Sequence, residues 1–411
     1  RAPPPAITIS RARAAARAAD AAARRNHRLS RSMPRFILEE SEPGAGVRAL
    51  PMIAPRASGV SDASPASLAL GFPAMSNRPI VLLLTNMDDS GLRLVREAAD
   101  VRMVDPKDRA AVEAGAKDAD AIITRTAGKI DVEVLDWAPK LRVIGRHGVG
   151  VDHIDVPAAT ARGIQVLSTP GANTQDVVEH VVAMMIGLSK HFQILIPELK
   201  AGNYAARTSM RGREIQGRTL GIIGFGRIGK RLGETCRLGF GMRVLYHDVV
   251  EAPEEAALRA GAVRVGFEEL LHQADYVSLH VPLDESTRGM IDRVALANIK
   301  KGCVLVNTSR GPVVDEEAVA DALDAGLLWG YGADVFEVEP PPPDHPLIGR
   351  RDVLATPHSA AQTEEGLRNM ATMVARDVLD VLAGRQPANP VNDPIEVERI
   401  RAESGKAPLY H

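Results

Sequence analysis

The stretch TLGIIGFGRIGKRLG, residues 219–233, decides the fold. Its first residues form an apolar run that is typical of a β-strand. Gly224, Gly226 and Gly229 then follow in a G-x-G-x-x-G spacing, at the start of a helical segment. Glycines at these places permit a tight turn, close approach of the backbone to a pyrophosphate, and close packing of helix on strand. Because a structural turn can share this spacing, the motif alone is weak evidence for a phosphate site at the helix N-terminus.

The next apolar run, MRVLYHD, strengthens that interpretation because it ends in Asp248. This is close to the offset of about 20 residues expected for an acid that binds the adenosine ribose. A carboxylate accepts hydrogen bonds from ribose hydroxyls but repels a 2′-phosphate, and no Arg or Ser cluster follows it. We therefore expect an NAD site that includes Gly224, Gly226, Arg227, Ile228, Gly229 and Asp248.

Short apolar runs alternate with helical segments along most of the chain. The strand-like runs include IVLLL, DAIIT, LRVIG, IQVLS, TLGIIG, MRVLYHD, YVSLHVP, VLVNTS and DVLATP, and a further strand-like segment ends at Asp334. Such alternation is typical of βαβ units in a parallel sheet. It is interrupted by a long, mostly apolar helical stretch at residues 174–202 and begins again at Thr219. We expect an α/β fold of two doubly wound parallel-sheet domains, one of the Rossmann type and one flavodoxin-like.

The expected domains are discontinuous in sequence. Residues 76–173 and 362–394 form the predicted substrate domain, and residues 174–361 form the predicted NAD-binding domain. Residues 395–411 are expected as a C-terminal tail. Residues 1–75 are rich in Ala, Arg, Ser and Pro and are expected to be a disordered or spurious extension. An organellar transit peptide is the alternative interpretation of that composition.

Charge and cysteine content exclude several classes of protein. Eleven Arg, no Lys and five acids give residues 1–75 a net charge of +6, so residues 76–411 carry −8 of the total of −2. A body that acidic argues against nucleic-acid binding. Two Cys suit neither a disulfide framework nor a metal site and favour a cytoplasmic protein. No apolar run approaches the ~20 residues that span a bilayer. The apolar stretch at 174–202 favours burial against a partner or against the other domain, and with the first alternative we expect a homodimer.

Three chemically suitable residues lie downstream of the nucleotide turn. Arg310 follows the run VLVNTS, Glu339 lies just beyond GADVFEV, and His358 follows VLATP. Ligands of open α/β sheets bind beyond the carboxyl ends of the strands, where these residues are expected. Each residue alone has an ordinary explanation as a solvated or structural side chain.

Taken together and in this order, the motifs resemble the D-2-hydroxyacid dehydrogenase family. The matching stretches are GIIGFGRIGKRL, VPLDESTRGMI, VLVNTSRGPVVDEEAV, GADVFEVEPPP and VLATPHSAAQTEE, and the resemblance spans residues 80–394. It implies an NAD-dependent oxidoreductase that transfers a hydride between NAD(H) and a small 2-keto or 2-hydroxy acid. Phosphoglycerate and hydroxypyruvate are candidate substrates.

The resemblance also implies a role for each catalytic candidate. Arg310 would bind the substrate carboxylate through paired N–H donors, which a Lys could not do in the same geometry. His358 would be the acid–base residue, since imidazole can both donate and accept a proton near neutral pH. Glu339 would stabilise the imidazolium, with Glu337 as a nearby rival. Further cofactor contacts implied by the resemblance are Pro282, Thr287, Thr308 and Asp334; Thr287 is equally explained as a helix cap.

The resemblance also implies a substrate side in the first domain, in the stretch GRHGVGVD. Backbone N–H groups of Gly148, Val149 and Gly150 are expected to hold a carboxylate. Arg125 and Lys129 stand where the resemblance implies basic residues near the distal end of the substrate, and Arg146 is nearby. Three cations favour a second anionic group on the substrate, although basic loop residues are commonly only solvated. Two alternatives remain open: a formate dehydrogenase-like enzyme, and an NAD-sensing binding module that resembles transcriptional corepressors.

Overall fold

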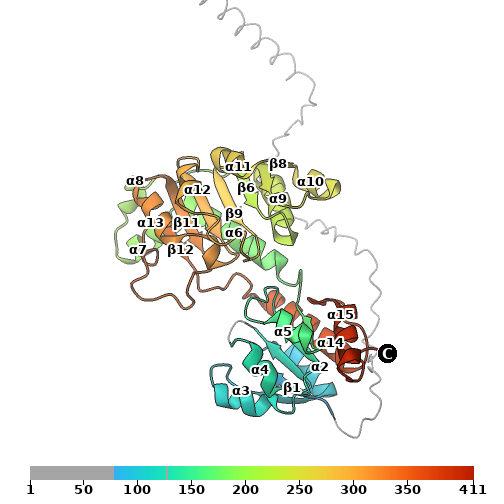
Figure 1. The fold of residues 1–411 in the computed structure, drawn as a ribbon. Helices are drawn as coiled ribbons and strands as arrows, with labels where there is room; N and C mark the ends of the chain where they lie inside the picture. The colour runs from blue at the N-terminus through green and yellow to red at the C-terminus, as the bar shows by residue number, and fades with distance from the viewer. Residues whose placement is uncertain (1–77, 126–127) are drawn as a thin grey trace, which may run out of the picture. The chain divides into compact units, whose positions relative to one another are not determined.

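The computed structural model describes residues 78–125 and 128–411 (Figure 1). The expected N-terminal extension, residues 1–75, lies outside these residues. The described residues contain two parallel sheets, so the expected α/β fold with two sheet domains is confirmed.

The first sheet has five strands in the order β2-β1-β3-β4-β5. Their bounds are Ile80–Leu83 (β1), Asp100–Met103 (β2), Ala121–Thr124 (β3), Val143–Arg146 (β4) and Gln165–Leu167 (β5). All neighbouring strands pair in parallel, and residues of β1, β3 and β4 are completely buried. Helices cover both faces of this sheet, which is why its central strands are continuous apolar runs.

Two groups of helices enclose the first sheet. One face packs on α2 (Asp89–Ala98), α14 (Glu364–Leu382) and α15 (Pro394–Glu403). The other face packs on α3 (Arg109–Ala116), α4 (Val132–Trp137) and α5 (Val156–Ala161). Residues after position 360 thus return to complete the core that residues 80–170 begin.

The second sheet has seven strands in the order β12-β11-β10-β9-β6-β7-β8. Their bounds are Thr219–Ile223 (β6), Arg243–His247 (β7), Ala262–Arg264 (β8), Tyr276–Leu279 (β9), Cys303–Asn307 (β10), Leu328–Ala333 (β11) and Val353–Ala355 (β12). The chain order reverses between β6 and β9, which is the place where open α/β sheets bind their ligands.

Helices also cover both faces of the second sheet. One apolar cluster contains residues of α11 (Phe267–Gln273), α12 (Arg293–Ala297) and α13 (Glu316–Asp324). The opposite cluster contains residues of α6 (Thr174–Ser189), α9 (Arg227–Phe240) and α10 (Glu254–Ala260). Figure 1 shows these elements around the strands of the second sheet.

The helical stretch expected at residues 174–202 is not one helix. It divides into α6 and α7 (Phe192–Lys200), and a short helix, α8 (Ala206–Ser209), follows. His191, the residue before α7, has φ of 57°, so the backbone leaves the right-handed helical region there. Two edge strands, β2 and β8, were not predicted, because most of their side chains are exposed and give no apolar run.

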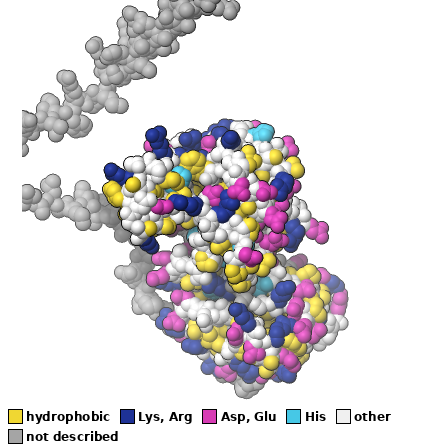
Figure 2. All heavy atoms as spheres, turned by 90° about the vertical axis from the view of Figure 1, so that its left-hand side faces the viewer, with side chains coloured by type: hydrophobic (Ala, Val, Ile, Leu, Met, Phe, Trp, Pro, Cys, Tyr) yellow, Lys and Arg dark blue, Asp and Glu magenta, His cyan; other side chains and the backbone are white. Residues whose placement is uncertain are grey.

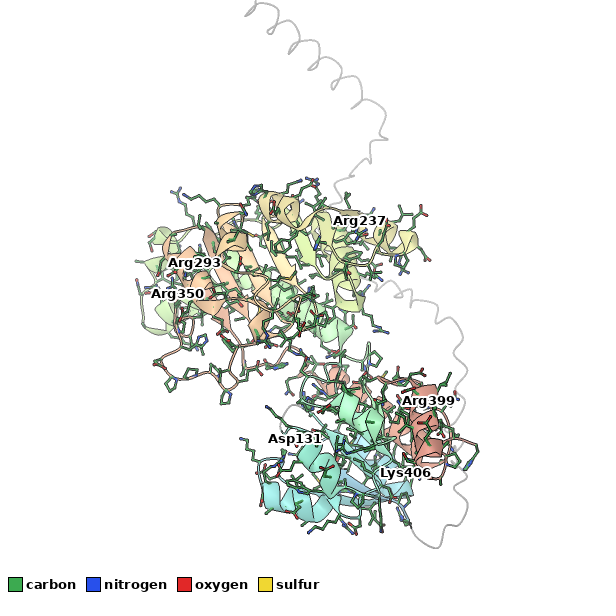
Figure 3. All side chains as sticks on the ribbon, viewed as in Figure 1. Asp131, Arg237, Arg293, Arg350, Arg399 and Lys406 are labelled. Carbon is green, nitrogen blue, oxygen red and sulfur yellow. The ribbon has the colours of Figure 1, made fainter. Side chains whose placement is uncertain are left out.

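The expectation of a C-terminal tail at residues 395–411 is wrong. This segment contains most of α15, and Val397 and Leu409 are completely buried in the core of the first sheet. The Lys406 ammonium donates to the backbone carbonyl of Arg162 at 2.8 Å. Figure 3 labels Arg399 and Lys406 beside this part of the fold. The single apolar positions that anchor the segment are too sparse to form a recognisable pattern in the sequence.

No helix among the described residues has both the length and the apolar character needed to cross a bilayer. On the face drawn in Figure 2, acidic, basic and hydrophobic side chains are interspersed, without a continuous band of one charge.

Candidate active site

A cleft of about 1040 Å³ lies beyond the carboxyl ends of strands from both sheets. The first sheet contributes residues that follow β2, β3, β4 and β5, and the second contributes the loops after β6, β9, β10, β11 and β12. Its volume is at the upper end of the range for small-molecule sites, about 300–1000 Å³. The residues predicted for the cofactor and for catalysis that line it are Gly226, Arg227, Ile228, Pro282, Thr308, Arg310, Asp334, Glu339 and His358.

The glycine turn connects β6 to α9 as predicted from its spacing. Gly224 has φ of 89°, and a Cβ there would lie 2.6 Å from the backbone of His280. A Cβ at Gly229 would lie 2.3 Å from the carbonyl oxygen of Gly224, so this glycine lets the helix approach the turn. At Gly226, by contrast, a Cβ would meet no atom within 4 Å. Space is therefore kept open at the N-terminus of α9, on the side that lines the cleft.

The residues around this turn fit a bound dinucleotide. Gly226, the N-cap of α9, offers no side chain to the first N–H groups of the helix, which leaves them available to an anion. The hydroxyl of Thr308 is buried and has no hydrogen-bond partner within the described part of the chain. Asn173 also lines the cleft, and its buried side-chain oxygen likewise has no hydrogen-bond partner among the described residues. Buried polar atoms of this kind normally have partners, so a polar ligand would satisfy them.

Asp248 lies beside the turn but not in the wall of the main cleft. Its carboxylate accepts hydrogen bonds from the backbone N–H groups of Phe225 at 2.7 Å and Val250 at 2.9 Å. These two bonds fix the carboxylate next to the glycine turn. Each oxygen retains a lone pair that could accept a ribose hydroxyl.

His358 and Glu339 form the central pair of the cleft. The Nδ1 of His358 lies 2.8 Å from Oε2 of Glu339. Because an ionised carboxylate only accepts, Nδ1 carries the proton and Nε2 is the nitrogen available to a ligand. The other oxygen of Glu339, Oε1, accepts a hydrogen bond from the backbone N–H of Phe336 at 3.1 Å, which fixes the carboxylate. Glu337, the rival acid, lacks this contact with the imidazole.

The surroundings of Glu339 keep it ionised. Burial by itself would raise the pKa of this carboxyl group. The hydrogen bond and charge of His358, the Phe336 amide and the charge of Arg310 outweigh burial and hold the pKa of Glu339 below its usual value of 4.5. An acid–base histidine paired with such a carboxylate has a defined tautomer and a stabilised protonated form.

Asp334 positions the turn that carries His358. Its buried carboxylate accepts from the hydroxyl of Thr356 at 2.6 Å and from the N–H groups of Ser359 and Ala360 at 2.8 and 2.9 Å. The backbone carbonyl of Asp334 accepts from His358 N–H at 2.7 Å. His358 itself has φ of 49°, a left-handed conformation that a non-glycine residue keeps only where its surroundings enforce it. Three of the acceptor positions of the carboxylate are thus used within the protein.

Arg310 reaches across the cleft to the first sheet. Its Nε and Nη2 both lie 2.8 Å from Oδ2 of Asp152, in the loop after β4. A Cβ at Gly150 would lie 1.5 Å from Nη2 of Arg310, so a side chain there would displace the guanidinium from this position. Burial alone would raise the pKa of Asp152, but the charge and hydrogen bond of Arg310 lower it overall. The predicted substrate-binding arginine is therefore already oriented by a carboxylate.

The other predicted cations differ in their contacts, and Lys129 does not line the cleft. Arg146 is buried and braces its own loop, with Nε donating to the carbonyl of Gly150 at 2.7 Å and Nη1 to that of His147. Burial, followed by the charges of Arg310 and Arg125, lowers the pKa of Arg146 to about 9. Arg125 lines the same cleft, forms no ion pair with any described residue, and has its pKa lowered by burial.

The predicted carboxylate loop is only partly available. The N–H of Gly148 donates to the carbonyl of Arg146 at 2.9 Å, so it is not free to hold a ligand. The N–H groups of Val149 and Gly150 have no partner among the described residues and line the cleft. The carboxylate contacts expected for Gly148, Val149 and Gly150 therefore stay predictions, with the N–H of Gly148 already paired within its own loop.

Thr287 does not line the cleft. Its hydroxyl donates to the carbonyl of Pro282 at 2.7 Å and accepts from the N–H of Asp284 at 2.9 Å. It stabilises a turn, which agrees with the alternative explanation as a local cap.

Comparison with known proteins identifies the family. The family model described as "D-isomer specific 2-hydroxyacid dehydrogenase, NAD binding domain" matches residues 182–360. A glyoxylate reductase of Korarchaeum cryptofilum is 38% identical over 331 residues, which cover 79% of this chain and 98% of that protein. The chain belongs to the D-isomer-specific 2-hydroxyacid dehydrogenase family.

Two further comparisons show the breadth of this dehydrogenase family. A D-3-phosphoglycerate dehydrogenase of Mycobacterium leprae is 39% identical over 314 residues, and the chain spans 59% of the length of that relative. The solved structure of D-lactate dehydrogenase from Aquifex aeolicus, complexed with NAD and lactic acid, aligns with a TM-score of 0.67 at 30% identity. It covers 76% of this chain and 98% of the solved one. Membership of the family gives the chain an NAD-binding domain of the D-isomer-specific 2-hydroxyacid dehydrogenase type.

Some residues of the dehydrogenase site were not predicted. Asp152 stands in the recognised stretch GRHGVGVD, where its acid among glycines could have signalled a partner for Arg310. His180 on α6 lies 2.9 Å from the hydroxyl of Thr356, under the turn of His358, and no local pattern marks it. Lys107 lines the cleft from the loop before α3.

Proposed function

We propose that this dehydrogenase reduces a small 2-keto acid to the D-2-hydroxy acid with NADH, and catalyses the reverse reaction with NAD. The observation that carries the proposal is the His358–Glu339 pair at 2.8 Å, in the same cleft as Arg310 and the open glycine turn. Formate oxidation needs no acid–base histidine, and a binding module needs no poised carboxylate.

Each protein group has one task in this scheme. The bound nicotinamide supplies or accepts the hydride. Arg310 binds the substrate carboxylate, which competes with Asp152 for the guanidinium. The free N–H groups of Val149 and Gly150 hold the same carboxylate from the other side of the cleft. His358 donates a proton from Nε2 to the carbonyl oxygen during reduction, and Glu339 stabilises the imidazole in the required tautomer.

We propose further that the preferred substrate carries a second anionic group. Arg125 supports this, because a half-buried guanidinium without an ion-pair partner among the described residues is unfavourable unless a ligand supplies the charge. Lys107 lines the same cleft. Candidates are 3-phosphohydroxypyruvate and sulfopyruvate, with hydroxypyruvate and glyoxylate as singly charged comparisons.

We also propose that the protein works as a homodimer through α7 and the segment that follows. Phe192, Ile196, Leu199 and Tyr204 expose 48%, 51%, 61% and 65% of their surface, and all four lie within thirteen residues of each other. Apolar side chains gathered in this way are typical of an interface. The cytoplasmic location expected from the cysteine usage stays a prediction.

The test follows NADH absorbance with the four keto acids, and with formate and NAD, for wild type and His358→Ala. We expect turnover of one keto acid, lost by about 10²–10⁴-fold in the variant. A matched variant, Arg125→Gln, should raise KM for the doubly charged substrates and leave glyoxylate unaffected. Turnover of formate alone would support the formate dehydrogenase alternative. Tight NADH binding without any turnover would support the binding module.

A further inference from the structure

Glu339 stands on a segment, residues 336–347, that contains no helix or strand. Its carboxylate must nevertheless stay within hydrogen-bond distance of His358. A catalytic group misplaced by about 1 Å can lower the rate about 10²-fold. Contacts outside the Glu339–His358 pair therefore have to fix this segment.

A buried Glu–His pair lies behind the segment and contacts both of its ends. The two carboxylate oxygens of Glu316 have different partners: Oε1 accepts from the backbone N–H of Glu337 at 3.1 Å, and Oε2 lies 2.9 Å from Nε2 of His345. Glu316 and His345 are each only 8% exposed. Neither residue lines the cleft, so this pair is separate from the residues that meet the substrate.

The donor and the acceptor of each hydrogen bond of the pair can be assigned. The backbone N–H of Leu347 donates to Nδ1 of His345 at 3.3 Å, so Nδ1 carries no proton. Nε2 then carries the proton and donates to Glu316. Both contacts of Glu316 are thus acceptor contacts, which a carboxylate satisfies and a carboxamide cannot.

The same segment is pressed against the residue that follows Arg310. A Cβ at Gly311 would lie 1.9 Å from the carbonyl carbon of Phe336 and 2.3 Å from the nitrogen of Glu337. The ring of His345 packs edge-on against Phe336, with centroids 5.3 Å apart. Glu316 begins α13, six residues after Arg310, so one short stretch supports both Arg310 and the segment of Glu339.

We propose that Glu316 and His345 form a positioning clamp that sets the carboxylate of Glu339 relative to His358. The clamp acts through Glu337 N–H at one end of the segment and His345 at the other. Its catalytic consequence rests on the proposed dehydrogenase function. Glu316 and His345 do not touch the substrate and are positioning residues.

The decisive variant is Glu316→Gln, which keeps the side-chain volume. The NH₂ group of its carboxamide must face either the N–H of Glu337 or the Nε2–H of His345, so that two donors oppose each other. If the proton of His345 moved to Nδ1 instead, it would face the N–H of Leu347, which is also a donor. We expect kcat to fall about 10- to 100-fold, with NADH affinity measured by fluorescence unchanged. Glu317→Gln is the matched control, because Glu317 is the exposed neighbour on the same helix and should keep the wild-type kcat.

A coupling experiment separates positioning from general destabilisation. If Glu316 acts through Glu339, adding Glu316→Gln to Glu339→Gln should lower kcat no further. His345→Gln, which retains a donor toward Glu316, should recover most of the activity lost in His345→Ala. Multiplying losses in the double variant would overturn the proposal, as would equal kcat for Glu316→Gln and Glu317→Gln in an active enzyme.

Hydrogen exchange tests the clamp without relying on turnover. Peptides covering residues 336–347 should exchange faster in Glu316→Gln than in wild type or Glu317→Gln, and peptides of β6 and α9 should not change. Unchanged exchange in the segment would overturn the clamp. If wild type turns over no keto acid, the proposed function fails, and this measurement still decides whether the clamp exists.

Discussion

At the scale of single residues, the geometry of the site depends on the hydrogen bonds that fix its polar side chains. His358 keeps an unusual left-handed backbone because Asp334 accepts its N–H and those of two following residues. Glu339 keeps its charge because the groups around it outweigh its burial. The order of Arg310, Glu339 and His358 could be predicted from the sequence, and the acid of Asp152 among glycines was a signal for the partner of Arg310. The bonds by which Asp334 supports the turn of His358 could not be predicted, because hydrogen bonds between residues more than 20 positions apart leave no local pattern.

The charge of Glu339 makes a prediction about pH. Because its pKa lies below 4.5, the carboxylate stays ionised over the whole neutral range and accepts the hydrogen bond from Nδ1 of His358 throughout. In Glu339→Gln we expect keto-acid reduction to be about 10²-fold slower at every pH in this range, since the carboxylate no longer fixes the tautomer of the imidazole. The measurement is kcat/KM for reduction between pH 5 and 9. A rate equal to that of wild type across this range would show that Glu339 does not act on the proton donor.

At the scale of elements, the strand–turn–helix unit β6–α9 was predictable because its glycines do separate tasks that the spacing reveals. The helix break at His191 and the edge strands β2 and β8 were not predictable. The break follows from one backbone conformation, and the edge strands expose most of their side chains. Periodicity detects buried faces, so elements with little buried surface escape it.

The glycines of that unit supply a matched pair of substitutions. Gly229→Ala would press a Cβ against the turn, so we expect an unfolding free energy lower by about 1–3 kcal/mol. Gly226→Ala meets open space, so its stability should be unchanged while NADH affinity falls at least about tenfold, because the methyl group occupies the place of the pyrophosphate.

Thermal unfolding and NADH fluorescence titration report the two effects separately. Gly239→Ala, on the same helix and also facing open space, serves as the control for both measurements. Wild-type NADH affinity in Gly226→Ala would argue against a phosphate at this turn.

At the scale of the whole molecule, exposed apolar side chains predict the oligomeric state, and shielded histidines predict how stability changes with pH. We expect the exposed apolar side chains of α7 and the segment after it to be covered by a second subunit. The variant Ile196→Asp should therefore convert the proposed dimer to a monomer, as measured by sedimentation or light scattering. Leu238→Asp on α9 is the control, since Leu238 is 70% exposed and lies outside that group. A monomeric wild type would overturn the proposed dimer.

One buried and two partly buried histidines should make the fold sensitive to mild acid. Burial, the largest cause in each case, lowers the pKa of His147 and His153 to about 4 and of His280 to about 3. The unfolded chain takes up these protons below about pH 6.5 and the folded chain does not, so stability falls as the pH drops from 6.5 toward 4. The slope should reach about 4 kcal/mol per pH unit if all three contribute.

Urea unfolding at several pH values measures that slope directly. The carboxyl groups with lowered pKa, such as Glu339, act only at lower pH, below their ordinary values near 4. A stability that stays constant between pH 6.5 and 4.5 would contradict this account.

The return of α14 and α15 to the first sheet has a consequence for synthesis on the ribosome. Val81, Leu83 and Val95 share their apolar cluster with Val374, Val378, Val397 and Leu409. The core around the earliest described residues can therefore close only after the last residues have been synthesised. The second sheet, by contrast, is complete once β12 has emerged from the ribosome. The domain that is translated second is the one that can finish folding first, and a nascent chain stopped near residue 360 would still expose one apolar face of its first sheet.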